Sequence, residues 1–282
     1  MSGVLKLIRP INCIMGIVGV LIGAMVGVGL DAFSAQYIFE ISVGCAIVYF
    51  FMAAGNMMND YFDRDLDRIN HPERPIPSGM LQAKDVITSA ALIYVLLMIL
   101  GILVNLMMLI ILVIALILMI VYEVSLKGRG FVGNITISLL VAMLFMFGAA
   151  AVSEFGVVIF LSLLAFLATL TREIVKDIED IEGDIDRYTL PKKIGTKSAG
   201  IVAGISIIVA VILSPIPYYP ELLPFIEFNS LGIYYLYLIL PADIIFILSI
   251  SFYIKNPNYA SQALKGGMAL ALVAFVLGGI FV

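Results

Sequence analysis

Apolar segments long enough to cross a lipid bilayer recur along almost the whole sequence. A bilayer core of about 30 Å needs about 20 apolar helical residues, and only helices or closed barrels satisfy their backbone hydrogen bonds inside it. We predict nine transmembrane helices, at residues 13–30, 38–58, 86–104, 107–124, 131–152, 155–175, 199–216, 231–253 and 264–282. The chain is therefore expected to form one all-α membrane bundle over residues 1–282, with no separate soluble domain.

The third and fourth segments run together, because no charged residue lies between Val86 and Tyr122. At about 1.5 Å per residue, this stretch is too long for a single crossing. Asn105 is its only strongly polar residue, so we expect the chain to turn there.

Composition supports the membrane class. The chain is 62% hydrophobic and 13% charged, whereas a soluble domain carries about 25% charged residues. Cys13 and Cys45 both fall in apolar runs, which indicates packing residues rather than a disulfide framework. His71 is the single histidine, and one His does not build a zinc site.

The placement of positive charge predicts the orientation of the chain. With nine crossings, every Lys and Arg lies near the N-terminus or in or beside the loops after the second, fourth, sixth and eighth helices. These loops share one face, while the opposite loops carry Asp31, Glu154, Glu221 and Glu227. Positive loops stay in the cytoplasm. We therefore expect a multi-pass protein of the cell membrane, with its N-terminus in the cytoplasm and its C-terminus outside.

The first of two acidic clusters follows the second segment. Asn59, Asp63 and Asp67 are spaced i, i+4 and i+8, which places them on one face of a helix. Like charges at this spacing destabilise a helix, and a divalent cation is the simplest compensation. Oxygen ligands alone suit Mg²⁺ or Ca²⁺ and do not suit Zn²⁺.

The second acidic cluster follows the sixth segment. Asp177, Asp180 and Asp184 are spaced i, i+3 and i+7, with Arg172 and Lys176 on the neighbouring face. A solvated, salt-bridged helix end would explain one such cluster. Two clusters at the same face favour a shared Mg²⁺ site for a diphosphate, in which the metal bridges phosphate oxygens and cations neutralise the rest.

Other cations accompany the two clusters. Arg74 lies in a Pro-rich loop, Lys127 opens the next loop on the same face, and Arg9 and Asn12 begin the first helix. A plain turn, a positive-inside anchor and a purely topological role explain these three features equally well. No Ser–His or Cys–His pair that would form a nucleophile is evident in the sequence.

The paired motifs Asn59-x3-Asp63-x3-Asp67 and Asp180-x3-Asp184, at the ends of the second and sixth helices, resemble the UbiA superfamily of intramembrane prenyltransferases. The resemblance covers nearly the whole chain. Within that superfamily, residues 9–12, 74–79 and 171–184 are similar to the branch that makes digeranylgeranylglyceryl phosphate.

The resemblance implies a bundle around a central cavity, capped by the cytoplasmic loops and open sideways to lipid. It implies catalytic carboxylates at Asp63, Asp67, Asp180 and Asp184. It implies Mg²⁺ held by these four with Asn59, assisted by Asp177. Substrate phosphates would be bound by Arg64, Arg74, Lys127, Arg172, Lys176, Arg9 and Asn12.

The implied reaction transfers a geranylgeranyl group from geranylgeranyl diphosphate to the hydroxyl of geranylgeranylglyceryl phosphate, a precursor of archaeal ether lipids. An aromatic, quinone-precursor or haem acceptor is the first alternative. A membrane transporter is the second, although transporters usually bind near the midplane, where Asp243 is the main acidic candidate. We expect membrane lipids around the chain, no nucleic acid and no obligatory protein partner.

Overall fold

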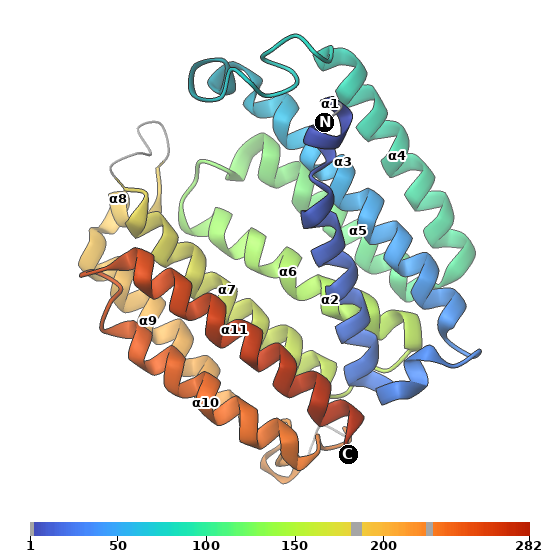
Figure 1. The fold of residues 1–282 in the computed structure, drawn as a ribbon, viewed down its shortest axis with the longest axis vertical. Helices are drawn as coiled ribbons and strands as arrows, with labels where there is room; N and C mark the ends of the chain where they lie inside the picture. The colour runs from blue at the N-terminus through green and yellow to red at the C-terminus, as the bar shows by residue number, and fades with distance from the viewer. Residues whose placement is uncertain (1–2, 182–187, 224–227) are drawn as a thin grey trace.

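Helices make up all the regular secondary structure in residues 3–181, 188–223 and 228–282, the part that the computed structural model describes. Within these residues, nine helical segments are long and apolar enough to cross a membrane (Figure 1). The crossing helices are α2 (Pro10–Val28), α3 (Ile38–Asn70), α4 (Ala83–Val104), α5 (Leu106–Val121), α6 (Phe131–Val152), α7 (Val158–Glu179), α9 (Thr196–Leu213), α10 (Ile233–Ile250) and α11 (Pro257–Ile280). The shorter elements are α1 (Gly3–Ile8), α8 (Leu190–Ile194), the 3₁₀ turns η1 (Gly29–Phe33) and η3 (Pro220–Leu222), and the π-helical turn η2 (Tyr122–Leu126).

The nine predicted crossings are confirmed, and so is the turn at Asn105. The Asn105 side chain caps α5, because its Oδ1 accepts hydrogen bonds from the backbone N–H groups of Met107 (2.8 Å) and Met108 (3.3 Å). Its Nδ2 donates to the carbonyl of Ala150 on α6, at 3.3 Å. One polar residue thus satisfies backbone groups that the start of α5 and the end of α6 expose in an apolar region.

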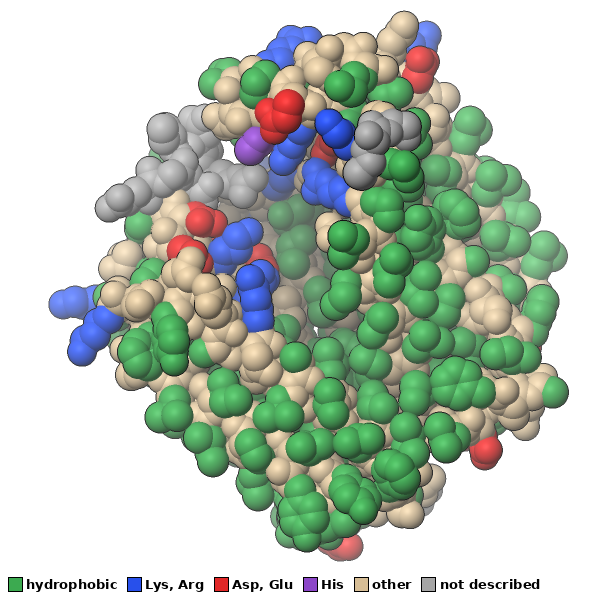
Figure 2. Space-filling view, in the orientation of Figure 1, with side chains coloured by type: hydrophobic (Ala, Val, Ile, Leu, Met, Phe, Trp, Pro, Cys, Tyr) green, Lys and Arg blue, Asp and Glu red, His purple; other side chains and the backbone are tan. Residues whose placement is uncertain are grey.

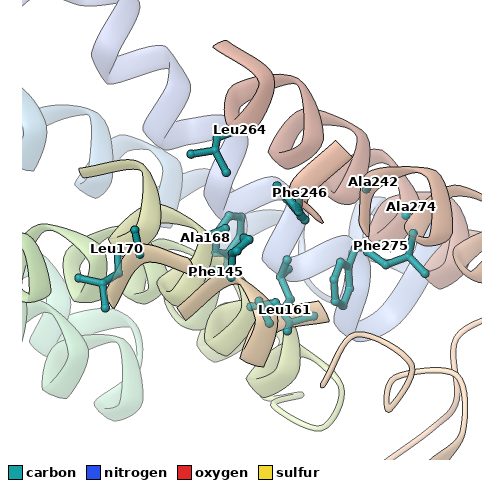
Figure 3. Packing of buried hydrophobic residues seen from close by; sticks show 14 of the residues in the cluster. Phe145, Leu161, Ala168, Leu170, Ala242, Phe246, Leu264, Ala274 and Phe275 are labelled. Atoms are coloured by element: carbon teal, nitrogen blue, oxygen red, sulfur yellow. The ribbon is translucent and has the colours of Figure 1, made fainter. Parts of the chain in front are cut away.

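The helices enclose two hydrophobic cores. One core is formed by side chains of α2 to α6, and the other mainly by side chains of α6, α7 and α9 to α11. Figure 3 shows the second core, where Phe145, Leu161, Phe246 and Phe275 come from four different helices. Helices α2 and α6 pack between the two groups of helices.

Small residues allow α2 and α6 to approach each other closely. A Cβ atom at Gly148 would overlap the carbonyl oxygen of Val20, and one at Gly23 would overlap the carbonyl oxygen of Phe145. Helices in lipid associate through close backbone approach at small residues, because lipid tails are as apolar as the helix side chains and no hydrophobic effect drives the helices together. On α4 and α5, by contrast, large side chains such as Leu103 (74% exposed) face outward, as expected for contact with lipid.

The Lys and Arg side chains and most of the acids gather at one end of the bundle. On the face shown in Figure 2, Lys and Arg side chains border a hollow with hydrophobic side chains inside it. The other end contains the last turn of α11, where the N–H of Gly232 donates to the carbonyl of Gly278 at 2.8 Å. The described loops at that end include the acids Asp31, Glu154 and Glu221. The two ends of the bundle thus differ in charge in the way the loop pattern predicts.

Candidate functional site

The C-terminal part of α3 presents the first acidic cluster. Because α3 continues without a break to Asn70, Asn59, Asp63 and Asp67 lie along one helical face, as predicted. Asp67 is buried, while Asn59 and Asp63 are half-buried. These side chains therefore lie within the folded protein rather than on a solvated helix end.

Both carboxylates on this face are held by cations from other segments. Lys127 Nζ lies 2.6 Å from Asp63 Oδ2, and Arg74 Nη1 lies 2.6 Å from Asp67 Oδ2. The cations offset the repulsion expected between carboxylates four residues apart on a helix. The structure thus brings together four of the predicted site residues, Asp63, Asp67, Arg74 and Lys127.

A third carboxylate, Asp60, joins the same end of α3 to the N-terminus. Its side chain is 4% exposed, forms an ion pair with Arg9 and lies 3.9 Å from Arg74 Nη1. Arg9 has a left-handed backbone (φ 50°), which is unusual for a residue other than glycine and is found where surrounding structure holds it. A pocket of about 260 Å³ lies here, lined by Lys6, Arg9, Asp60, Glu73, Arg74 and Pro75.

The turn η2 supplies a buried acid beside the first cluster. Glu123 Oε1 accepts a hydrogen bond from Asn59 Nδ2 at 3.0 Å, and its Oε2 lies 3.1 Å from Lys127 Nζ. The Glu123 side chain is only 3% exposed. Asn59, Glu123, Lys127 and Asp63 therefore form a continuous chain of polar contacts.

The second acidic cluster is only partly described. Helix α7 ends at Glu179, with Asp180 as its exposed C-cap residue, so the regular helical face reaches only as far as Asp177. Asp177 Oδ2 accepts a hydrogen bond from Asn134 Nδ2 on α6, at 2.8 Å. Arg172 pairs with its neighbour Glu173 at 2.6 Å, and Lys176 is exposed. Asp184 lies outside the described residues.

The donor chemistry of α3 fits a magnesium ion. Mg²⁺ typically takes one or two carboxylates and completes its shell with phosphate oxygens and water. Asp63 and Asp67 supply two carboxylates. Each ion pair is made through Oδ2 alone, and a carboxylate has further lone pairs with which it can bind a metal. Within the described residues, no three His, Cys, Asp or Glu side chains gather around one point. The shared site with the acids after α7 therefore stays a prediction.

Three further residues lie apart from this cluster of contacts. Arg64 donates to the carbonyl of Tyr61 at 2.7 Å and stacks over its ring, with 4.5 Å from Cζ to the ring centroid. Asn12 is exposed on α2. Asp243 is buried within α10, where its Oδ2 accepts a hydrogen bond from Ser214 Oγ at 2.6 Å in an otherwise apolar cavity.

Sequence reasoning missed Asp60, Glu123 and Asn134 as members of these contacts. Glu123 could have been found, since it ends a long uncharged run and lies four residues before Lys127, the spacing of a helical ion pair. Asn134 lies one turn inside a membrane helix, where polar side chains usually have a partner. Asp60 could also have been found, because it is spaced i, i+3 and i+7 with Asp63 and Asp67, although its partner Arg9 is visible only in the fold.

An apolar cavity of about 190 Å³ lies on the membrane side of the polar contacts. Val48, Phe51 and Met52 of α3 line it together with residues of α5 and α6. Met52 precedes Asn59 by seven residues, or about 10 Å along the helix axis. A charged head bound at the acidic face of α3 would thus have apolar space close to it.

The chain is similar to known membrane proteins over nearly its whole length. The model described as the UbiA prenyltransferase family matches residues 20–280. Digeranylgeranylglyceryl phosphate synthase of Methanosphaera stadtmanae is 37% identical over 287 residues, which cover 99% of this chain and 100% of that protein. The synthase of Methanosarcina mazei is also 37% identical and covers 97% of both chains.

Solved structures show the same fold. A structure described as digeranylgeranylglyceryl phosphate synthase in membranes is 35% identical, with a TM-score of 0.87 over 99% of this chain and 98% of that one. A UbiA homolog from Archaeoglobus fulgidus bound to DMAPP and Mg²⁺ has a TM-score of 0.69 at 19% identity, covering 98% of this chain and 99% of that one. At that identity, the second likeness concerns the fold alone.

Proposed function

Because this chain belongs to the UbiA prenyltransferase family, we propose that it transfers a geranylgeranyl group from geranylgeranyl diphosphate to the hydroxyl of geranylgeranylglyceryl phosphate. The chain is a multi-pass intramembrane prenyltransferase. The choice of acceptor is supported by relatives that bear the name digeranylgeranylglyceryl phosphate synthase and match almost end to end. Both substrates combine an apolar chain with an anionic head, which suits a bundle with charged side chains at one end.

The observation that carries the proposal is the acidic face of α3. Its two carboxylates, Asp63 and Asp67, are each held by a cation from a different segment. Oxygen ligands and cations in one place are what a metal-bound diphosphate requires. We assign Asn59, Asp63 and Asp67 to the metal, together with Asp180 and Asp184, and with Asp177 assisting.

When held by these carboxylates, Mg²⁺ would supply positive charge that stabilises the leaving diphosphate. Lys127 and Arg74 lie where they can neutralise further phosphate charge, and Arg172 and Lys176 are assigned the same role beside α7. The allylic C–O bond of the donor breaks and a C–O bond to the acceptor oxygen forms. The released diphosphate or a neighbouring carboxylate takes the hydroxyl proton.

The apolar interior of the bundle has two tasks in this reaction. It keeps water away from the carbon that develops positive charge, so that the acceptor hydroxyl attacks instead. It also holds the two lipid chains in one orientation, which makes the bimolecular step effectively intramolecular. The cavity bounded by Phe51 and Phe147 is placed to receive part of a prenyl chain.

We further propose that the charged end faces the cytoplasm. The described loops on that side carry the Lys and Arg side chains, and positive loops are retained inside. The N-terminus and the site would then be cytoplasmic, and the C-terminus outside. Labelling of single cysteines placed at Ser34 and at Ser78, in a variant without Cys13 and Cys45, tests this orientation, because a membrane-impermeant reagent should reach only position 34 from outside.

The function is tested with purified full-length protein, Mg²⁺ and geranylgeranyl diphosphate against a panel of acceptors. We expect product with geranylgeranylglyceryl phosphate and at least about 100-fold less turnover after Asp63→Ala combined with Asp180→Ala. Asp65→Ala is the matched control, since Asp65 lies on the exposed side of α3 (69% exposed) and should leave turnover unchanged. Preference for an aromatic or quinone-precursor acceptor would overturn the proposed acceptor, and normal turnover in the double variant would overturn the proposed site.

A further inference from the structure

Glu123 is a buried acid that touches two residues of the proposed site without belonging to the face of α3. We infer that Glu123 is a positioning residue, which orients Asn59 toward the metal and holds Lys127 beside Asp63. The inference rests on the proposed function, since it assigns a role within that site. Each oxygen of the Glu123 carboxylate has a different partner, Asn59 Nδ2 at Oε1 and Lys127 Nζ at Oε2.

The contact with Asn59 determines which end of its amide is presented to a ligand. An Asn side chain has a carbonyl oxygen that can bind a metal and an NH₂ group that cannot. A carboxylate only accepts hydrogen bonds, so Glu123 attracts the NH₂ group. The carbonyl oxygen on the same planar amide is then directed away from Glu123. Glu123 therefore selects the rotamer in which Asn59 can act as an oxygen ligand.

The contact with Lys127 determines where the ammonium group lies. Two of the three N–H donors of an ammonium can serve Glu123 at 3.1 Å and Asp63 at 2.6 Å. A Lys side chain is long and flexible, and holding it in one place removes rotamer freedom. Because the Lys127 side chain is 16% exposed and Glu123 is 3% exposed, this placement is made inside the protein. The charge is thereby fixed next to the metal ligand before substrate arrives.

The local backbone brings these groups together. Residues Tyr122–Leu126 form a π-helical turn, in which the N–H of Lys127 donates to the carbonyl of Tyr122 at 2.9 Å. Such turns are rare and occur often at functional sites. Here the turn connects the last residues of a membrane helix to the charged end of the bundle. It directs the Glu123 side chain inward, to α3, although Val124 and Ser125 beside it are exposed.

A purely structural ion pair is the competing explanation for Glu123. Breaking a buried pair destabilises a protein, so loss of activity alone would not separate the two explanations. Outer partners of metal ligands typically change metal affinity by about 10–100-fold. Metal dependence is therefore the quantity to measure, on protein that remains folded.

The variant to test is Glu123→Gln, which keeps the shape of the side chain but replaces one acceptor oxygen with a donor. The probe is geranylgeranyl thiolodiphosphate, an unreactive donor analogue, titrated into purified full-length protein at several Mg²⁺ concentrations. We expect the half-saturating Mg²⁺ concentration to rise by about 10-fold or more. In turnover assays the KM for the donor should rise, whereas the KM for the lipid acceptor should stay the same.

The swapped pair Asn59→Asp with Glu123→Gln provides a second, independent variant. A Gln at 123 can donate to an Asp at 59, so the contact is restored and a carboxylate oxygen faces the metal. We expect this double variant to bind the analogue at lower Mg²⁺ concentrations than Glu123→Gln alone. Glu179→Gln is the matched control, because Glu179 accepts a hydrogen bond from the amide of Asn258 at 2.7 Å in a pair that does not include α3.

The outcomes separate this inference from the proposed function. If the wild-type protein does not bind the analogue with Mg²⁺, the proposed function fails and the role of Glu123 fails with it. If the wild-type protein binds and Glu123→Gln binds equally well at the same Mg²⁺ concentration, only the role of Glu123 is overturned. A change confined to the melting temperature would likewise show a structural ion pair and overturn the positioning role.

Discussion

Replacing Arg74 by Met should destabilise the protein more than replacing any exposed arginine of α3. The Arg74 guanidinium lies 2.6 Å from Asp67 and 3.9 Å from Asp60, and these two side chains are 6% and 4% exposed. Removing one partner of a buried ion pair costs about 3–5 kcal/mol, because the other charge is left without compensation. Arg74 is itself 30% exposed, and Asp60 keeps Arg9. We therefore expect a loss at or below the lower end of this range, about 2–3 kcal/mol.

The two free cysteines offer an assay for this loss. Cys13 is buried and Cys45 is half-buried, so a thiol-reactive dye should report their exposure as the purified protein unfolds on heating. For a chain of this length, roughly 2 °C of melting temperature corresponds to 1 kcal/mol, which predicts a decrease of about 4–6 °C. Arg68→Met is the control, since Arg68 pairs at 3.3 Å with Asp65 while both are more than two-thirds exposed, and should change little.

A double-mutant cycle tests the cause. If Arg74 acts by compensating Asp67, then Arg74→Met should cost much less in a background that already carries Asp67→Asn. We expect a coupling of at least about 1 kcal/mol between the two changes. Purely additive effects, or equal effects of Arg74→Met and Arg68→Met, would refute the reasoning.

Two further predictions concern the packing of the bundle, both read as melting temperatures in the same thiol assay. Gly148→Ala should prevent proper assembly of α2 and α6, because the new methyl group would overlap the carbonyl of Val20. Gly266→Ala on α11 is the control, since its methyl group meets no atom within 4 Å and should be neutral or stabilise by up to about 1 kcal/mol. Equal effects of the two substitutions would contradict the close approach of α2 and α6. Asn105→Ala should cost about 1 kcal/mol through loss of the cap of α5, and Asn105→Asp, which keeps the acceptor for Met107, should cost less.

The fold was largely predictable, because hydrophobicity and charge vary along this chain on the length scale of a membrane. Nine apolar runs and the confinement of Lys and Arg to alternate loops specify the helix number and the end at which each loop lies. Even the division of α4 from α5 followed from one residue, Asn105, since a lone polar side chain in an apolar run must find a partner. These patterns do not show which helices pack against each other. That α2 packs against α6 depends on the positions of Gly23 and Gly148, whose role is visible only when both helices are placed.

The site was predictable to the extent that it lies on one helix. Spacing alone places Asn59, Asp63 and Asp67 on a common face, because the helical period relates residues four apart. The cations around this end of α3 come from distant segments: Lys127, from the turn after α5, meets Asp63, and Arg9, from the junction of α1 and α2, meets the neighbouring Asp60. Periodicity carries no information about such pairs. The resemblance to a family named Lys127 and Arg9 as site residues, but it did not say which carboxylate each would meet.

Asp60 shows that a sequence motif does not name every member of a helical face. Asp60, Asp63 and Asp67 are spaced i, i+3 and i+7, which places Asp60 on the same side of the helix as Asp67. In the structure, Asp60 holds Arg9, Asp67 holds Arg74, and Arg74 also approaches Asp60. The carboxylates of Asp60 and Asp67 are thus connected through Arg74. A substitution at Asp60 should therefore disturb both Arg9 and Arg74, and through Arg74 the environment of Asp67, even though Asp60 is not among the residues assigned to the metal.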